Sequence, residues 1–222
     1  MLMKGFKIMK KGAIFDLDGT LSKSGEGITK SLQYALEKVG IKEDDLESLN
    51  HFVGPPLKYE LKRTYDMTDE LAVRVTELYR ERYTPIGIYE TELYPGTVEL
   101  LQNLRKGGKY IAMATSKPQS MAEEVLRHLK IDKYFDMVMG ADLTGPKKDK
   151  ASVLNSLFEK LEIKDKNQYI MIGDTKFDAE GAKAVGIDCI GVSYGYGTRE
   201  ELEECGAIKV ADSTDELQGI LL

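Results

Sequence analysis

Two carboxylates, Asp16 and Asp18, directly follow a short apolar stretch, residues 13–15, and precede Gly19 and Thr20. On a regular strand both would point in the same direction, but here the strand is expected to end and the chain to turn, so both can approach one centre. Mg²⁺ binds oxygen ligands, and Asp16 can supply one of the one or two carboxylates it usually needs. Gly19 permits an unusual turn, and Thr20 can bond the exposed backbone groups there. A plain polar turn is the alternative, but the specific string Asp-Leu-Asp-Gly-Thr-Leu favours a reactive site.

A second pair of carboxylates, Asp174 and Asp178, follows another apolar stretch, residues 169–172. In a doubly wound sheet the loops at the carboxyl ends of the strands meet in one crevice, so Asp174 can face Asp16 despite the long sequence separation. Asp178 is expected on the same helical face as Asp174. The pattern Gly-Asp-x-x-x-Asp is weak by itself, and a helix N-cap role for either aspartate is an equal alternative.

Two hydroxyls, Thr115 and Ser116, follow the expected strand at residues 110–114. We expect them at the start of a helix, where backbone N–H groups and hydroxyls together form an anion site. A plain N-cap is the alternative, and one residue can do both.

Three lysines, Lys147, Lys148 and Lys150, precede an expected helix at residues 151–161. A run of lysines is usually a solvated surface. A transferring phosphoryl group, however, needs a fixed cation to offset its charge, and one of these lysines is placed to reach the same crevice.

The elements that must position these residues alternate along the chain. Strand, helix, strand alternation predicts a parallel sheet covered on both faces, that is, an α/β doubly wound, Rossmann-like core. Residues 22–87 show helical periodicity without a convincing strand, which predicts a small α-helical cap inserted in a core made of residues 1–21 and 88–222. A last short strand and helix are expected within residues 207–222. The expected core strands are residues 13–15, 110–114, 137–139, 169–172 and 188–192.

The composition excludes several partners. The 222 residues carry a net charge of −6, with 42% apolar and 31% charged residues, as in ordinary globular proteins. No basic cluster suits a nucleic acid polymer, and no apolar run approaches the roughly 18 residues that span a membrane. Lysines interrupt any signal-peptide core near the N-terminus, so a cytoplasmic location is expected.

These four motifs, in this order and each at the end of an expected strand, resemble those of the haloacid dehalogenase-like phosphatases over nearly the whole chain. Within that superfamily the sequence is similar to the phosphoglycolate phosphatase and 5′-nucleotidase-like branch, which has a helical cap after the first motif. Residues 191–202 also resemble that branch. Where the branch often reads Asp-Ser after the first motif, this chain has Lys23 and Ser24, which bears on substrate identity.

The resemblance implies a role for each motif residue. Asp16 would be the nucleophile, and Asp18 the general acid and base. Asp174 would bind the metal with Asp16 and the backbone carbonyl of Asp18, while Asp178 would support the metal site or Lys150. Lys150, rather than Lys147 or Lys148, best matches the family's lysine at a helix start. The expected catalytic set is Asp16, Asp18, Thr115 and Lys150; the phosphate-binding set is Leu17, Thr115, Ser116 and Lys150; and the metal set is Asp16, Asp18 and Asp174, supported by Asp178.

The implied activity is Mg²⁺-dependent hydrolysis of a small phosphomonoester, such as phosphoglycolate, a nucleoside monophosphate or a sugar phosphate, through an aspartyl phosphate. One alternative is a sugar phosphomutase, whose cap commonly begins with a His-containing segment; residues 22–28 contain no His. A dehalogenase has no use for Asp18 or a metal. A non-catalytic regulatory protein that binds phosphoesters is the other alternative, but it would be expected to have lost at least one motif residue.

The expected cap contributes two further hypotheses. The turn at residues 54–57, Gly-Pro-Pro-Leu, is expected to hold side chains such as Leu57 or Lys58 over the crevice and to help select the leaving group. A plain start of a cap helix is an equal alternative. The cap tyrosines recur at helical spacing and are interpreted as packing residues rather than substrate contacts; they are Tyr59, Tyr65, Tyr79 and Tyr83.

Overall fold

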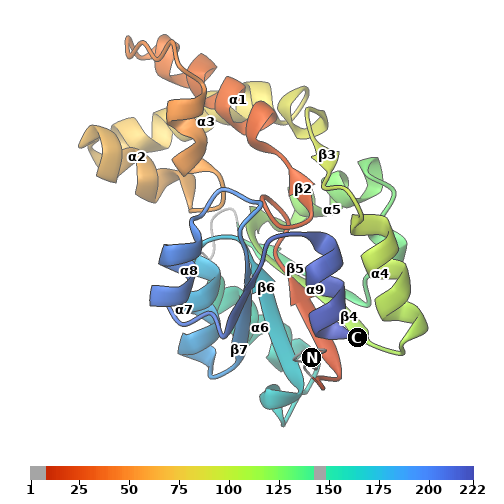
Figure 1. The fold of residues 1–222 in the computed structure, drawn as a ribbon. Coiled ribbons are helices and arrows are strands. Elements are labelled where there is room, and N and C mark those ends of the chain that lie inside the picture. The colour runs from red at the N-terminus through yellow and green to blue at the C-terminus, as the bar shows by residue number, and fades with distance from the viewer. Residues whose placement is uncertain (1–8, 143–148) are drawn as a thin grey trace.

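A parallel sheet lies at the centre of the molecule. The structure, a computed structural model, describes residues 9–142 and 149–222. Ile14, in the middle strand, lies beside Ala112 on one side and Met171 on the other. Within the described residues six strands pair in parallel in the order β5 (Met137–Ala141), β4 (Tyr110–Pro118), β1 (Gly12–Phe15), β6 (Tyr169–Gly173), β7 (Asp188–Val192) and β8 (Lys209–Ala211) (Figure 1).

The strand order reverses beside β1. From β1 the chain continues to β4 and β5 on one side, and then returns to β6, β7 and β8 on the other. The carboxyl ends of β1, β4 and β6 therefore lie together at a topological switch point, the place where doubly wound sheets bind ligands. The predicted fold class is confirmed.

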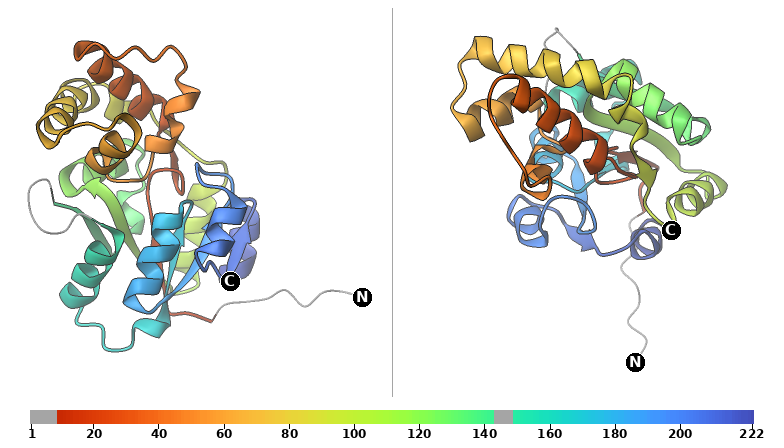
Figure 2. Two further views of the ribbon diagram at one scale, coloured as in Figure 1. Left: turned by 90° about the vertical axis from the view of Figure 1, so that its left-hand side faces the viewer. Right: turned by 90° about the horizontal axis from the view of Figure 1, so that it is seen from above.

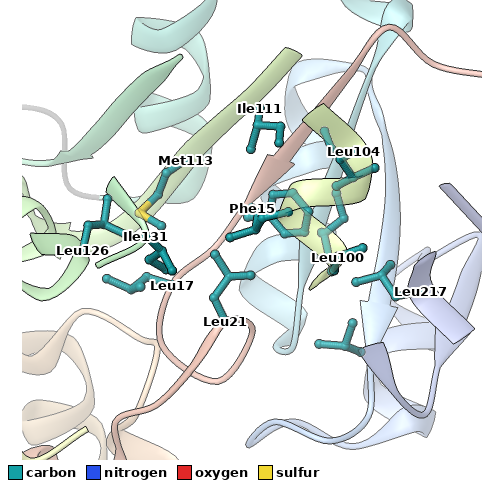
Figure 3. Packing of buried hydrophobic residues seen from close by; sticks show 14 of the residues in the cluster. Phe15, Leu17, Leu21, Leu100, Leu104, Ile111, Met113, Leu126, Ile131 and Leu217 are labelled. Atoms are coloured by element: carbon teal, nitrogen blue, oxygen red, sulfur yellow. The ribbon is translucent and has the colours of Figure 1, made fainter. Parts of the chain in front are cut away.

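Both faces of the sheet are covered by helices because the strand residues alternate between faces. Phe15 of β1 packs on one face with Leu100, Leu104 and Leu217 (Figure 3), whereas Ile14 belongs to the cluster on the other face. The first face is covered by α4 (Thr97–Lys106), α5 (Gln119–His128) and α9 (Thr214–Leu221), and the second by α6 (Lys150–Lys160) and α7 (Lys176–Val185).

A helical cap lies over the carboxyl ends of the strands, as Figures 1 and 2 show. It has its own buried cluster, to which Leu32, Ala35 and Leu36 contribute at the spacing of one helical face. The predicted cap is confirmed, and we propose that it comprises residues 22–87. Its helices are α1 (Gly25–Lys38), α2 (Leu57–Tyr65) and α3 (Asp69–Tyr83), with a 3₁₀ turn at Glu47–Phe52; a second 3₁₀ turn, Gly87–Tyr89, begins at the last residue of the cap.

The two crossings between core and cap form one small ribbon. β2 (Ser22–Lys23) pairs antiparallel with β3 (Glu92–Leu93). The expectation of helices alone from residue 22 was wrong here, because a strand of two residues is too short for a period-two pattern. Both chain crossings are thus hydrogen-bonded to each other.

The remaining elements agree with the expectations from the sequence to different degrees. The expected tail of one strand and one helix is confirmed by β8 and α9, which follow α8 (Arg199–Glu204). Strand β4 continues to Pro118, past the expected end at residue 114, with an irregularity in its pairing after Thr115. Over the described residues no helix combines the length and the apolar character needed to cross a membrane.

Candidate active site

The loop after β1 is organised by the backbone of Leu17. Its carbonyl oxygen accepts hydrogen bonds from the backbone N–H groups of Thr20, Leu21 and Ser22 at 3.3, 3.0 and 3.0 Å. Gly19 lies in this loop with φ of +81°, and a Cβ there would collide with the Asp174 carboxylate. Glycine is therefore required both for the backbone conformation and for the approach of the second acidic motif.

Lys150 joins three segments of the core at their carboxyl edge. Its Nζ lies 2.9 Å from Asp16 Oδ1 and 2.7 Å from Asp178 Oδ1, and it donates to the carbonyl oxygen of Ala114 at 2.8 Å. Only 3% of the Lys150 side chain is exposed. Two carboxylate oxygens and one carbonyl oxygen thus surround the ammonium. The structure thus brings Lys150 to the predicted site, while Lys147 and Lys148 lie outside the described residues.

Asp174 is held by groups from two other loops. Thr20 Oγ1 donates to its Oδ1 at 2.9 Å, and the backbone N–H of Tyr196 donates to its Oδ2 at 2.9 Å. The Thr20 hydroxyl therefore bonds a carboxylate and not the backbone groups expected from the sequence. Asp174 itself is fully buried.

Asp178 fixes the first turn of α7. Its Oδ2 accepts hydrogen bonds from the backbone N–H and the hydroxyl of Thr175 at 3.0 and 2.9 Å. Thr175 is the N-cap of this helix, so the alternative in which Asp174 or Asp178 is the N-cap was wrong. Asp178 uses its other oxygen for Lys150, which agrees with the supporting role implied by the resemblance.

Asp16, Asp174 and Asp178 together suit a divalent cation. Each offers one carboxylate oxygen, and these atoms lie within 4.8 Å of one another. Burial, then the charges of Asp178 and Asp16, raise the pKa of Asp174 well above its ordinary value. Lys150 supplies only one positive charge to these three carboxylates, so a bound divalent cation would offset the remainder. The donor set, made only of carboxylate oxygens, is that of a hard cation.

The pKa of Asp16, the candidate nucleophile, is shifted as well. Burial raises the pKa of Asp16 to about 6, with Lys150 opposing this shift and the neighbouring Asp178 and Asp18 adding to it. Burial acts to lower the pKa of Lys150, but Asp16 and Asp178 outweigh it and raise that pKa above its usual value. Lys150 therefore stays charged beside Asp16.

The carboxylate of Asp18 contacts a lysine other than Lys150. Lys117 Nζ lies 3.0 Å from Asp18 Oδ2 and donates to the hydroxyl of Tyr83 at 2.6 Å. Lys117 is 8% exposed and Tyr83 2% exposed. The sequence interpretation missed Lys117 and treated Tyr83 as packing alone. The available signal was the spacing of Thr115 and Lys117, which places two polar residues two apart at the end of a strand.

Thr115 reaches the same edge of the sheet, although not as expected. The register pairs Phe15 with Met113, which places Thr115 beside the start of the first-motif loop. Its Oγ1 accepts a hydrogen bond from the backbone N–H of Lys117 at 3.2 Å. The expectation that Thr115 and Ser116 begin a helix was wrong, because β4 extends to Pro118 and α5 begins at Gln119.

A model of the haloacid dehalogenase-like hydrolase family matches residues 13–192. The chain belongs to this family. A predicted phosphatase from Clostridium acetobutylicum has a similar solved structure, with a TM-score of 0.92, 40% identity, and coverage of 95% of this chain and 97% of that one.

Three curated relatives carry different names. A 5′-nucleotidase of Pseudomonas aeruginosa is 40% identical and covers 85% of each chain. A phosphoglycolate phosphatase of Vibrio parahaemolyticus is 32% identical over 91% of this chain and 92% of its own. The tyrosine-protein kinase PtkA of Mycobacterium tuberculosis is 35% identical over 94% of this chain and 71% of its own. The family, the phosphoglycolate phosphatase and 5′-nucleotidase relatives and the similar phosphatase structure together define an enzyme of the phosphoric monoester hydrolase class.

Proposed function

We propose that this enzyme hydrolyses a small phosphomonoester with Mg²⁺, through an aspartyl phosphate on Asp16. The observation that carries the proposal is the buried group of Asp16, Asp174 and Asp178 around Lys150 at the switch point of the sheet. A nucleophile, a fixed cation and a place for a divalent cation are the parts that phosphoryl transfer requires.

In the first step, Asp16 attacks phosphorus and the alcohol leaves. Lys150 Nζ, 2.9 Å from Asp16 Oδ1, holds the nucleophile and offsets charge on the phosphoryl oxygens. The P–O bond to the leaving group breaks as the bond to Asp16 forms, and protonated Asp18 gives its proton to the leaving oxygen. Thr115 and the backbone at Leu17 and Ser116 lie at this edge to bind phosphate oxygens.

In the second step, water replaces the alcohol. Asp18, now ionised, takes a proton from a water molecule that attacks the phosphorus of aspartyl phosphate, which regenerates Asp16 and releases inorganic phosphate. One carboxyl group thus serves first as acid and then as base.

Mg²⁺ would be held by Asp16, Asp174 and the backbone carbonyl of Asp18, and when bound it neutralises negative charge on the transferring phosphoryl group. Asp178 supports this site through Lys150 and Thr175. Mg²⁺ is preferred to a softer metal because the available ligands are carboxylate oxygens.

The substrate is proposed to be small because the cap lies over the carboxyl ends of the strands, where the reacting groups are located (Figure 1). The names of two relatives, 5′-nucleotidase and phosphoglycolate phosphatase, direct the first tests to nucleoside monophosphates and phosphoglycolate. Sugar phosphates complete the panel, since a mutase shares the core reaction.

The test is turnover of an aryl phosphate with Mg²⁺ and with a chelator, followed by the panel of phosphomonoesters. We expect release of inorganic phosphate that requires Mg²⁺. Transfer of the phosphoryl group between positions of a sugar, without release, would identify a mutase. No turnover of any ester, with phosphoesters still bound, would support a regulatory protein and contradict the proposal.

A further inference from the structure

Lys117 is a second buried lysine at the site, with no part in the proposed steps. Its Nζ contacts Asp18 Oδ2 at 3.0 Å and the Tyr83 hydroxyl at 2.6 Å, and lies 4.7 Å from the centre of the Tyr83 ring. A buried ammonium is unfavourable unless its N–H groups are bonded and its charge is paired. Such a group in a phosphatase site therefore calls for a role.

The two carboxylate oxygens of Asp18 have different surroundings. Oδ2 is held by Lys117, whereas Oδ1 is buried and has no hydrogen-bond partner within residues 9–142 and 149–222. Buried polar atoms without partners are rare, and a catalytic role is one explanation for them. The Lys117 ammonium donates hydrogen bonds and cannot accept one. Its contact with Oδ2 therefore leaves Oδ1 to carry the proton of Asp18 and directs Oδ1 away from the lysine.

The position of Lys117 depends in turn on the cap. Tyr83 is the last residue of α3, and its ring stacks on Tyr79 with centroids 5.0 Å apart and an angle of 13° between the planes. Tyr83 also belongs to the core cluster that contains Leu17 and Met113. Three parts of the chain therefore meet at one ammonium: the cap through Tyr83, β4 through Lys117, and the first-motif loop through Asp18.

We infer that Lys117 is a positioning residue for Asp18, and that Tyr83 makes this positioning depend on docking of the cap over the core. The inference rests on the proposed function, because it assigns the orientation of the proposed acid and base. Docking of the cap and delivery of the proton to the leaving group are thereby linked through one side chain.

A role confined to stability makes a different prediction. A structural lysine, once removed, would lower turnover of every ester by the same factor. A lysine that acts through Asp18 would matter most where the leaving group needs its proton. Alkyl phosphates, with strongly basic alkoxides, need it more than aryl phosphates.

The experiment compares Lys117→Met and Tyr83→Phe on p-nitrophenyl phosphate and on an alkyl phosphate that the parent hydrolyses. For Lys117→Met we expect kcat to fall at least about tenfold more for the alkyl ester than for the aryl ester, within the 10²–10⁴-fold typical of acid and base catalysis. KM should change by less than about threefold, because the substrate phosphate is bound by other groups. Tyr83→Phe should change the alkyl-to-aryl ratio in the same direction by a smaller factor.

Tyr65→Phe is the matched control. It also removes one hydroxyl from a cap tyrosine, but that hydroxyl donates to Glu43 Oε1 at 2.9 Å within the cap. We expect it to leave the alkyl-to-aryl ratio unchanged. In the double variant, Tyr83→Phe should add nothing to the ratio already produced by Lys117→Met, since the tyrosine acts through the lysine.

The outcomes separate the inference from the proposed function. If the parent hydrolyses both esters but Lys117→Met and Tyr83→Phe reduce them equally, the positioning role is wrong and the phosphatase proposal stands. If the parent hydrolyses neither ester, the proposed function itself fails. Thermal unfolding of each variant identifies loss of the fold, and Tyr83→Phe, which keeps the buried ring, still decides the question if Lys117→Met does not fold.

Discussion

Asp16 and Asp18 are separated by a single residue, yet they contact lysines from different parts of the fold. Around Asp16, the contacts seen within residues 9–142 and 149–222 come from the core: Lys150 begins α6, and Asp178 lies in α7. Around Asp18, Lys117 of the core also bonds Tyr83 of the cap. We call these groups the Asp16 side and the Asp18 side.

The difference suggests that the two sides act on different parts of the substrate. In the proposed mechanism the Asp16 side holds the phosphoryl group, which is common to all phosphomonoesters, and its residues lie at the edge of one sheet. In the same mechanism the Asp18 side serves the leaving group, which differs between substrates, and on this side the cap contributes Tyr83. Variants of the two sides should therefore respond differently to a change of leaving group.

The largest effect is expected on the Asp16 side. Asp16→Asn removes the nucleophile, so turnover of aryl and alkyl esters alike should fall close to the uncatalysed rate. Mass spectrometry should find no phosphorylated protein. Asp215→Asn, an exposed aspartate on α9, is the control and should match the parent. Phosphate on the Asp16→Asn protein would show that the nucleophile is another residue.

On the Asp18 side, Asp18→Asn should discriminate between leaving groups. Loss of the proton donor is expected to slow alkyl esters by about 10²–10⁴-fold and aryl esters much less. A reactive aryl phosphate should still phosphorylate Asp16, and the intermediate should persist because no base activates water. Mass spectrometry after rapid quenching measures this. Equal losses for both esters would remove the distinction between the two sides.

The crowded charges of the Asp16 side predict a pH dependence of stability without Mg²⁺. Because the pKa of Asp16 is raised from 3.8 to about 6, the folded protein keeps a proton in this range that the unfolded chain releases. Its contribution to stability therefore falls as pH rises through this window, by roughly 3 kcal/mol in total. Relative to the parent, Asp16→Asn should gain about this much between pH 4 and pH 7 in denaturant unfolding with a chelator. A constant difference between the two proteins would contradict the raised pKa.

The metal site gives the next effect. Asp174→Asn replaces an anionic ligand by a neutral one, so half-maximal activity should need at least about tenfold more Mg²⁺. Excess Mg²⁺ should restore part of the activity, because Asn can still bond both Thr20 and Tyr196 after a flip of its amide. A titration of activity against Mg²⁺ tests this. An unchanged midpoint would show that Asp174 only fixes loops.

The smallest effect concerns the cap turn. Leu57 packs against the cap's own cluster and Lys58 Nζ pairs with Asp69 at 3.1 Å, so neither is placed as the sequence hypothesis required. Gly54 is the residue of this turn that faces the core: its φ is +100°, and a Cβ there would lie 3.1 Å from Thr175 Cγ2. Gly54→Ala should therefore disturb cap docking and lower kcat/KM by up to about tenfold, or 1.4 kcal/mol.

Gly40→Ala is the control for Gly54→Ala, because it introduces the same backbone strain away from the contact between cap and core. Gly40 also has a positive φ, +83°, but a Cβ there would meet nothing within 4 Å. Both variants should be destabilised by about 1–2 kcal/mol through strain, and only Gly54→Ala should lose activity. Equal losses of activity would mean that the contact with Thr175 is irrelevant to docking.

The sequence predicted the Asp16 side well because its geometry follows from parallel strands. Asp16, Asp174 and Lys150 each stand next to a strand or at a helix start, and the topology brings those ends together without any knowledge of side-chain packing. Asp178 could be placed in the same way, from its spacing to Asp174.

The Asp18 side could not be predicted because it depends on docking. Lys117 has no motif of its own, and it was hidden by the expectation that a helix begins near Thr115. Tyr83 has the spacing of a packing residue, and it does pack in the core cluster. Its hydrogen bond to Lys117 exists only because the cap rests on the core, which no local pattern encodes.

The position of β1 has a consequence for the order of folding. The strand that carries the proposed nucleophile, β1, is synthesised before β4 and β6, with which it pairs, and β6 ends only at Gly173. Until then the edge of β1 that pairs with β6 has no partner strand, and the contacts of β1 close long loops, which slows folding. The cap has its own buried cluster, whose buried members lie within residues 32–78, so it can gain structure before β6 is made. A nascent chain that stops short of β6 would hold a formed cap beside an apolar central strand with an open edge, the kind of species that chaperones bind.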